Sequence, residues 1–270
     1  MLRDGYRMPL VLVRGAGDVG SAVAHALHES GFAVLLHDDP RPSHARRGMS
    51  FTDAPYNGVP TLAGVVGKRA RDASDLLPMM RCRRAVALTD LPVAEVVRLL
   101  SPDLVVDARM RKRVRPESQH ELAPLVVGLG PNYEAGANAD VAVETGWGND
   151  LGKVIRSGRC RDFAGEPQLI AGHGRDRYVY SPCEGEFSTT LRIGDVVYAG
   201  QEVARIGTEI LRAPLSGRLR GLTHAGAVVT LGAKVVEVDP RGPTAQVHGL
   251  GDRPRRIARG VLEAIGNFAR

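Results

Sequence analysis

Glycines and acids near the start of the chain have the spacing of a nucleotide-binding turn. Gly15, Gly17 and Gly20 form a G-x-G-x-x-G run. The acids of His37-Asp38-Asp39 follow roughly 20 residues later, the distance at which an acid holds a ribose hydroxyl. The first glycine permits the tight bend, the second admits a diphosphate to the backbone, and the third lets helix and strand pack closely. These residues predict a cradle for a diphosphate.

The flanking segments have the patterns that would position this turn. Leu10 to Val13 is a short apolar run suited to a strand that is buried on both faces. From Ser21 the apolar residues recur at helical spacing up to Gly31, and a second strand is expected at 33–36. The helix would then begin at the turn and direct its N-terminus toward the anion.

A second glycine-rich loop follows a strand that we expect at 124–129. It covers 128–136, and a further strand at 141–145 is broken by a turn that contains Trp147. The two loops could form two walls of one pocket with Glu144 at its rim, or they could be ordinary connections with glycine at left-handed positions. The predicted cofactor-binding residues are Gly15, Gly17, Asp18, Gly20, Asp38, Asp39, Gly128, Gly130 and Glu144.

The middle of the chain alternates strand and helix patterns, which indicates a parallel sheet. We expect strands at 84–90 and 104–107 and a helix at 93–100. Asp90 and Asp107 then end strands at the edge where open α/β sheets bind ligands. For Asp90 we favour the role of a helix cap.

An internal repeat with an offset of 32 residues marks the second half of the chain. Its matched pairs include Pro182 with Pro214, Gly185 with Gly217, Val197 with Val229, Gly200 with Gly232 and Ile206 with Val238. Each unit is too short to bury its own apolar face, so two units should pack as one small barrel. The pattern is similar to biotinyl/lipoyl domains, but the hairpin at 206–212 has no lysine, which excludes covalently bound biotin or lipoate.

These patterns predict an α/β protein in three parts. A Rossmann-like doubly wound parallel sheet is expected at 1–175, a small all-β barrel-sandwich hybrid domain at 176–240, and a C-terminal helical tail at 241–270. The barrel is interpreted as a structural or docking module.

Composition limits the classes of function. The chain has 270 residues, is 43% hydrophobic and carries a formal charge of +6, which is typical of a globular protein. The basic run at 109–115 suits phosphates, whereas the aromatic content of 4% argues against nucleic acid. The start has too short an apolar run for a secretory or membrane segment, so we predict a cytoplasmic protein without a membrane partner.

No catalytic group stands out in the sequence. Three widely spaced cysteines and the absence of ligand spacing suggest no disulfide and no metal site. His37, His120 and His173 are candidates for an acid or base, but each is better explained as a surface histidine. The catalytic residues therefore stay unknown.

The order of parts resembles the accessory proteins of selenium-dependent molybdenum hydroxylase systems, which are distantly like xanthine dehydrogenase accessory factors. The resemblance is carried by segments at 15–18, 128–131, 144–145, 151–155, 238–241 and 260–265. Trp147 and Asn149 stand where the family pattern has an arginine and a histidine.

This resemblance implies a maturation role, in which the crevice binds the molybdenum cofactor, as a phosphorylated pterin, or a nucleotide without a covalent bond. A molybdenum hydroxylase subunit is then an expected partner, and a homo-oligomer is left open. Two alternatives are an NAD(P)-dependent oxidoreductase, from the glycine turn, and a non-enzymatic scaffold that docks a hydroxylase subunit.

Overall fold

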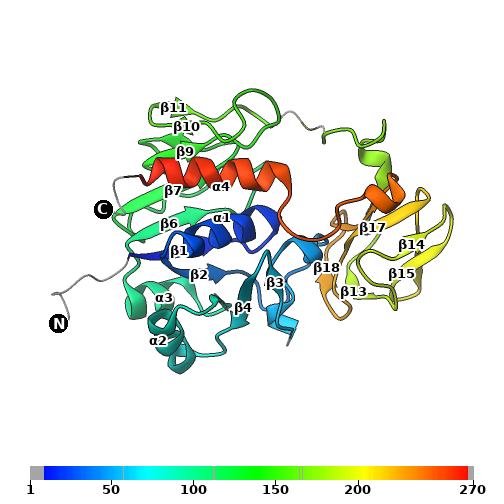
Figure 1. Cartoon of the computed structure of the whole chain (residues 1–270), viewed down its shortest axis with the longest axis horizontal. Coiled ribbons are helices and arrows are strands. Elements are labelled where there is room, and N and C mark those ends of the chain that lie inside the picture. The colour runs from blue at the N-terminus through cyan, green and yellow to red at the C-terminus, as the bar shows by residue number, and fades with distance from the viewer. Residues whose placement is uncertain (1–8, 57, 112, 164, 166, 267–270) are drawn as a thin grey trace.

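A nine-stranded sheet forms the larger part of the protein in the computed structural model, which describes residues 9–56, 58–111, 113–163, 165 and 167–266 (Figure 1). The strand order is β10-β9-β7-β6-β1-β2-β5-β4-β3. The strands from β4 to β9 in this order pair in parallel, whereas β3 and β10 are antiparallel at the edges. Their bounds are β1 Leu10–Arg14, β2 Ala33–His37, β3 Thr61–Leu62, β4 Val65–Arg69, β5 Val86–Thr89, β6 Leu104–Asp107, β7 Leu125–Leu129, β9 Val141–Val143 and β10 Val154–Ile155.

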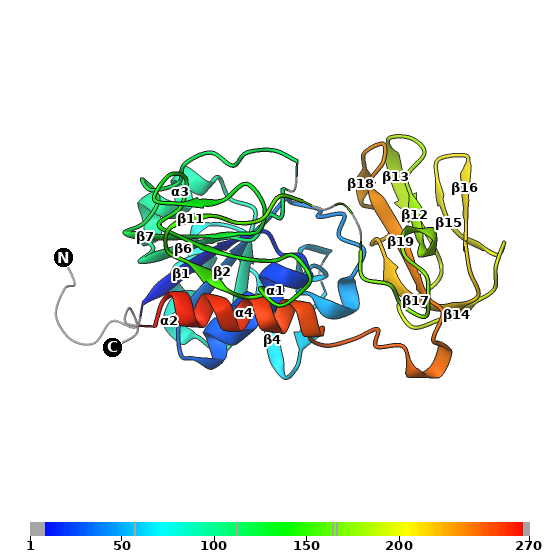
Figure 2. The ribbon, with the colours of Figure 1, turned by 90° about the horizontal axis from the view of Figure 1, so that it is seen from above.

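Helices cover both faces of this large sheet, because alternate side chains of its strands point to opposite faces and both sets are apolar. Val11 and Val13 of β1 pack with α1 (Asp18–Glu29) and α4 (Asp252–Ala264), while Leu10 and Leu12 pack with α2 (Ala73–Cys82) and α3 (Val93–Leu100). α4 lies beside α1 although the two are far apart in sequence (Figures 1 and 2). The C-terminal helix therefore belongs to the core of the large sheet.

The second region consists of two four-stranded antiparallel sheets around a separate apolar core. Their orders are β12-β19-β17-β14 and β16-β15-β13-β18. The bounds are β12 Tyr178–Tyr180, β13 Gly185–Ser188, β14 Val196–Val197, β15 Glu202–Ile206, β16 Glu209–Arg212, β17 Gly217–Leu222, β18 Val228–Val229 and β19 Lys234–Asp239. A small pair, β8 (Glu134–Ala135) with β11 (Gly158–Arg159), forms a separate two-stranded sheet that contacts β9.

The two repeat units pair with each other in both sheets. Strand β14 of the first unit pairs with β17 of the second, and β18 of the second pairs with β13 of the first. Each unit thus completes the sheet that contains the other. We call residues 178–239 the two-sheet region.

The general α/β class is confirmed, and several predicted elements differ from the structure at their ends. α1 begins at Asp18 rather than at Ser21, and the strand expected at 84–90 is β5, Val86–Thr89. β4 and α2 were not predicted, because the apolar residues of β4 are interrupted by Gly67 and Lys68. Part of the final helical pattern, residues 267–270, lies outside the described residues.

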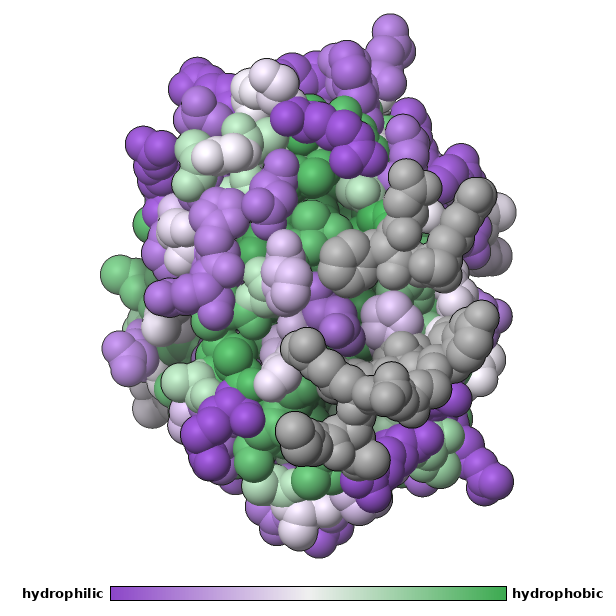
Figure 3. Space-filling model, turned by 90° about the vertical axis from the view of Figure 1, so that its left-hand side faces the viewer, coloured by the Kyte–Doolittle hydropathy of each residue, from purple (hydrophilic) through white to green (hydrophobic). Residues whose placement is uncertain are grey.

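The two ends of the large sheet differ in their surroundings. The strands begin at the left of Figure 1, and the space-filling view of that end shows apolar side chains gathered among polar ones (Figure 3). The start of α1 lies at the other end, where Arg46 connects it to the two-sheet region (Figure 1). No helix in the described part of the chain is long and apolar enough to cross a membrane.

Candidate functional site

The sheet reverses its winding between β1 and β6. The chain passes from β1 through α1 to β2 on one side, whereas β5 and α3 lead back across to β6 on the other side. Open α/β sheets bind ligands outside the carboxyl ends of the strands at such a point. Arg14 and Asp107 stand opposite each other at these two ends.

A buried carboxylate positions the first arginine at this edge. The Asp107 side chain is 2% exposed and accepts the Arg109 Nε hydrogen at 3.0 and 3.1 Å. It also accepts from Gln119 Nε2 at 2.6 Å, and the Gln119 oxygen accepts from Arg14 at 2.5 Å. Burial alone would raise the pKa of Asp107, but the hydrogen bonds from Arg109 lower it below its ordinary value. Arg109 and Arg14 are thereby held in fixed positions.

Three guanidinium groups converge on a second, exposed carboxylate, that of Glu117. Arg109 and Arg111 both donate to it, the first at 2.8 Å, and an Arg14 nitrogen lies 3.6 Å away. The Glu117 side chain is 50% exposed. Burial would raise the pKa of Glu117, but the bonds from Arg111 and Arg109 lower it to about 2, so it is ionised at neutral pH. We call Arg14, Asp107, Arg109, Arg111, Glu117 and Gln119 the edge cluster.

The edge cluster contains a hydrogen-bond donor that has no acceptor among the described residues. Burial lowers the pKa of Arg14, and the neighbouring charge of Arg109 lowers it further. The Arg14 Nε atom is buried and has no hydrogen-bond partner in the described part of the chain. Guanidinium forks match the geometry of carboxylate and phosphate groups, so this arrangement can bind an acid group in place of Glu117.

The predicted glycine turn is closed by the protein's own side chains. Gly15 has φ of +100°, and a Cβ atom on Gly20 would lie 1.8 Å from the Gly15 oxygen, so both glycines serve close packing. The Ala16 amide donates to Asp38 at 2.5 Å, and the exposed Asp39 only donates its amide to Asp38. The donor expected to meet a diphosphate is therefore bonded to a carboxylate.

A loop also covers the start of α1. His44 donates from Nε2 to Asp38 at 2.9 Å, and its ring lies 3.3 Å from the position of a Cβ atom on Gly17. Arg46 donates to Asp18 at 2.8 Å. Burial would raise the pKa of Asp18, but the charges of Arg46 and Arg253 lower it to about 2. The Asp18 carboxylate at this helix end is thus paired with cations of the protein itself.

The second glycine loop has a packing role in the structure. A Cβ atom on Gly128 would lie 2.0 Å from the Tyr133 ring, and Gly130, with φ of +95°, faces Thr145. Glu144 is buried and accepts from the amides of Thr145 and Gly146 at 2.7 and 2.6 Å and of Arg161 at 2.8 Å. That these residues bind a cofactor stays a prediction.

Sequence reasoning found Asp107 and the basic run at 109–115 but missed the other half of the edge cluster. Arg14 was overlooked although it directly follows an apolar strand, which was a usable signal. Glu117 and Gln119 carry no sequence signal, because a coil segment brings them to the strand ends. Lys112, within the run, lies outside the described residues.

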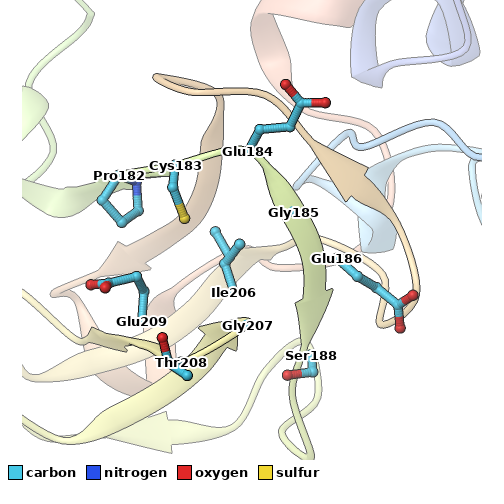
Figure 4. A pocket seen from close by; sticks show the side chains of 10 residues that line it. All are labelled: Pro182, Cys183, Glu184, Gly185, Glu186, Ser188, Ile206, Gly207, Thr208 and Glu209. Carbon is cyan, nitrogen blue, oxygen red and sulfur yellow. The ribbon is translucent and has the colours of Figure 1, made fainter.

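A hollow of about 780 Å³ lies elsewhere, on the two-sheet region (Figure 4). Figure 4 shows Ile206 near its centre, with Cys183 on one side and Thr208 and Glu209 on another. The lining includes three glutamates and no arginine or lysine, so it does not suit an anion. The lysine-free hairpin predicted at 206–212 forms part of its wall.

Metal chemistry, and thiol chemistry at Cys160, receive no support from the described residues. Within them, no group of three or more His, Cys, Asp or Glu side chains is arranged to hold a metal ion. Cys160 is buried, and burial together with the charge of Glu144 raises the pKa of its thiol to about 12. This thiol stays protonated at neutral pH.

Comparisons with known proteins give one relative by sequence. No family model matches the chain. Over 256 residues, 95% of this chain, it is 34% identical to the uncharacterized protein YqeB of Escherichia coli (strain K12). The match covers 47% of that relative, so the chain spans about half its length.

The solved structures that match this chain have low TM-scores. The product-bound ectoine utilization protein EutE (DoeB) from Ruegeria pomeroyi has a TM-score of 0.26 at 14% identity, covering 86% of this chain and 85% of that one. A succinylglutamate desuccinylase from Silicibacter sp. TM1040 has a TM-score of 0.24 at 14% identity, with 87% and 85% covered. Scores this low transfer no activity to this chain.

The comparisons contradict the predicted family. The solved structures compared are named as an ectoine utilization protein and desuccinylases, not as selenium-dependent molybdenum hydroxylase accessory proteins. Maturation of a molybdenum hydroxylase, the NAD(P)-dependent oxidoreductase alternative, the scaffold for a hydroxylase subunit and nucleotide binding in a Rossmann crevice are therefore withdrawn. The resemblance depended on six short segments, and in two of them Gly15 and Gly128 are explained by close packing.

Proposed function

We propose that the chain binds a small molecule carrying a phosphate or carboxylate group, at the edge cluster. The observation that carries this proposal is the convergence of Arg14, Arg109 and Arg111 on one half-exposed carboxylate. It supports a site in which Glu117 occupies the place of the ligand's acid group. The position at the winding reversal favours the same site.

Energetics favour exchange of Glu117 for a ligand. An exposed ion pair stabilises a protein by only about 0–1 kcal/mol, so release of Glu117 costs little. Hydrogen bonds between charged groups contribute roughly 1.5–3 kcal/mol each. Arg109 and Arg14 are already oriented by Asp107 and Gln119, so little side-chain freedom is lost when a ligand binds.

The fold proposal that goes with this site is more specific than the α/β class. The strand order and the helices on both faces support a doubly wound sheet of Rossmann type, used here without a nucleotide. The two interleaved sheets support a barrel-sandwich hybrid that acts as a structural or docking module. The cytoplasmic location, the possibility of a homo-oligomer and the lack of a nucleic acid or membrane partner stay predictions.

Calorimetric titration with inorganic phosphate, pyrophosphate and succinate tests the function. Arg111→Ala should weaken binding of whichever probe binds by tenfold or more, because a charged hydrogen bond is worth roughly 1.5–3 kcal/mol. Arg205→Ala is the matched control, since Arg205 is an exposed arginine paired with Glu202 on the two-sheet region. Equal losses in both variants, or no binding of any probe to the wild type, would refute the proposal.

A further inference from the structure

A second group of charges lies between the start of α1 and the two-sheet region. Arg46 donates to Asp18 at 2.8 Å and to Glu237 of β19 at 2.8 and 3.1 Å. Arg177 and Lys234 also donate to Glu237, at 2.5 and 2.8 Å. We call this group the junction network; it consists of Asp18, Arg46, Arg177, Arg220, Lys234, Glu237, Asp239 and Arg241.

Two buried carboxylates of the junction network, Glu237 and Asp239, are already hydrogen-bonded to other donors. The Glu237 side chain is 0% exposed and receives the four hydrogen bonds from Arg46, Arg177 and Lys234. Asp239 accepts both arms of the Arg241 fork, at 2.9 and 2.6 Å. Neither side chain has a free oxygen directed at a further donor within hydrogen-bond distance.

Arg220 is the donor that this arrangement leaves without an acceptor. Its side chain is 13% exposed, and its nearest carboxylate oxygens, on Glu237 and Asp239, lie 3.8 and 3.9 Å away. Its Nε atom is buried without a partner in the described part of the chain, and so is the Nε atom of Arg177. Buried donors are almost always hydrogen-bonded in proteins, so an acceptor is required here.

Charge distinguishes the kinds of acceptor. The five cationic side chains of the network face three carboxylates. Burial lowers the pKa of Arg220 and the charge of Arg46 lowers it further, which reflects this crowding of cations. Water would satisfy the donors but not the charge, whereas a doubly charged oxyanion satisfies both.

We propose that the junction network binds a small tetrahedral dianion, a phosphate or sulfate group, through Arg220. The anion accepts the hydrogen bonds that Glu237 and Asp239 cannot accept and neutralises the excess charge between the two regions. This site is separate from the edge cluster and does not depend on it.

The test follows phosphate binding in chains whose edge site is weakened by Arg111→Ala. Wild type, Arg111→Ala, and Arg111→Ala combined with Arg220→Met are titrated with inorganic phosphate, inorganic sulfate and glycerol phosphate, each against sodium chloride at equal ionic strength. Midpoints of thermal unfolding and calorimetric affinities are measured. We expect phosphate or sulfate to raise the midpoint of Arg111→Ala and the added Arg220→Met to weaken that binding at least tenfold.

Each outcome separates the two proposals. A phosphate effect that survives Arg220→Met, or its absence from Arg111→Ala, overturns the junction site, whatever happens at the edge cluster. A response to glycerol phosphate as strong as to phosphate assigns the site to the phosphoryl group of a larger molecule. If Arg220→Met fails to fold, Arg220→Lys keeps the charge but lacks the planar fork; unchanged phosphate affinity in that variant would equally overturn the proposal.

Discussion

The edge cluster and the junction network are built from the same residue types, yet their central carboxylates differ in exposure. Glu117 meets three arginines and is 50% exposed, whereas Glu237 meets three arginines and a lysine and is 0% exposed. An exposed carboxylate can be replaced by water or a ligand at small cost, while a buried one cannot. Exposure of the carboxylate, rather than the number of arginines, therefore decides whether a ligand can take the place of that carboxylate.

Removal of the buried charge should have the largest effect. Glu237→Gln leaves Arg46, Arg177 and Lys234 without their anion, and breaking a buried ion pair in this way costs roughly 3–5 kcal/mol. Urea denaturation should show that loss in the free energy of unfolding, or failure to fold. Glu202→Gln, which breaks the exposed pair with Arg205, is the control and should cost at most about 1 kcal/mol. Similar losses of unfolding free energy in both variants would show that exposure of the carboxylate does not set the cost of its removal.

The glycine turn offers a second comparison, between two positions with different neighbours. A Cβ atom on Gly20 would lie 1.8 Å from a backbone oxygen, so Gly20→Ala should destabilise by about 1–3 kcal/mol or more. A Cβ atom on Gly17 would lie 3.3 Å from the His44 ring, which can move, so Gly17→Ala should change stability by less than about 1 kcal/mol. The free energy of unfolding of each variant checks this, and the reverse order would mean that the turn is not shaped by packing.

Sequence patterns predicted the framework of the fold, but they could not show whether the glycine turn at 15–20 is open to a ligand. Apolar strands such as Leu10–Arg14 and the amphipathic helix Val93–Leu100 follow local patterns, so they could be predicted. That Asp38 bonds the Ala16 amide, and that Arg46 links Asp18 to Glu237, depends on contacts across 22, 28 and 191 residues. Sequence spacing cannot show whether such a turn is open.

Contacts between residues far apart in sequence also explain why only half of the edge cluster was predicted from the sequence. The basic run after Asp107 is local, and it was read as a phosphate-binding patch. The Arg14 contact to Gln119 spans 105 residues and arises because β1 and β6 are neighbours in the sheet. Residues at the ends of adjacent parallel strands can be combined only when the strand order is known.

A smaller effect is expected when the exposed carboxylate of the edge cluster is neutralised. Glu117→Gln should tighten the binding of phosphate or succinate by up to about fivefold, because the exposed ion pair that competes with the ligand is worth at most about 1 kcal/mol. The free energy of unfolding should fall by no more than about 1 kcal/mol. Calorimetric affinities measure the first quantity and urea denaturation the second. Weaker binding in Glu117→Gln would mean that Glu117 supports the ligand instead of occupying its place.

The smallest effect is expected at His44, in the loop that covers the glycine turn, and it depends on pH. Burial would lower the pKa of His44, but its hydrogen bond to Asp38 raises the pKa above the ordinary value of 6.5. A group whose pKa is raised by folding stabilises the folded state fully below its unfolded pKa, and this contribution is lost as the pH rises through the folded value. The His44 side chain is 41% exposed, so solvent limits the contribution to below about 1 kcal/mol. The difference in unfolding free energy between wild type and His44→Gln should therefore shrink as the pH rises above 6.5. A difference that grows with pH would show that the His44 imidazole is neutral in the folded protein. Asp38 would then accept from the Ala16 amide without a charged partner at His44.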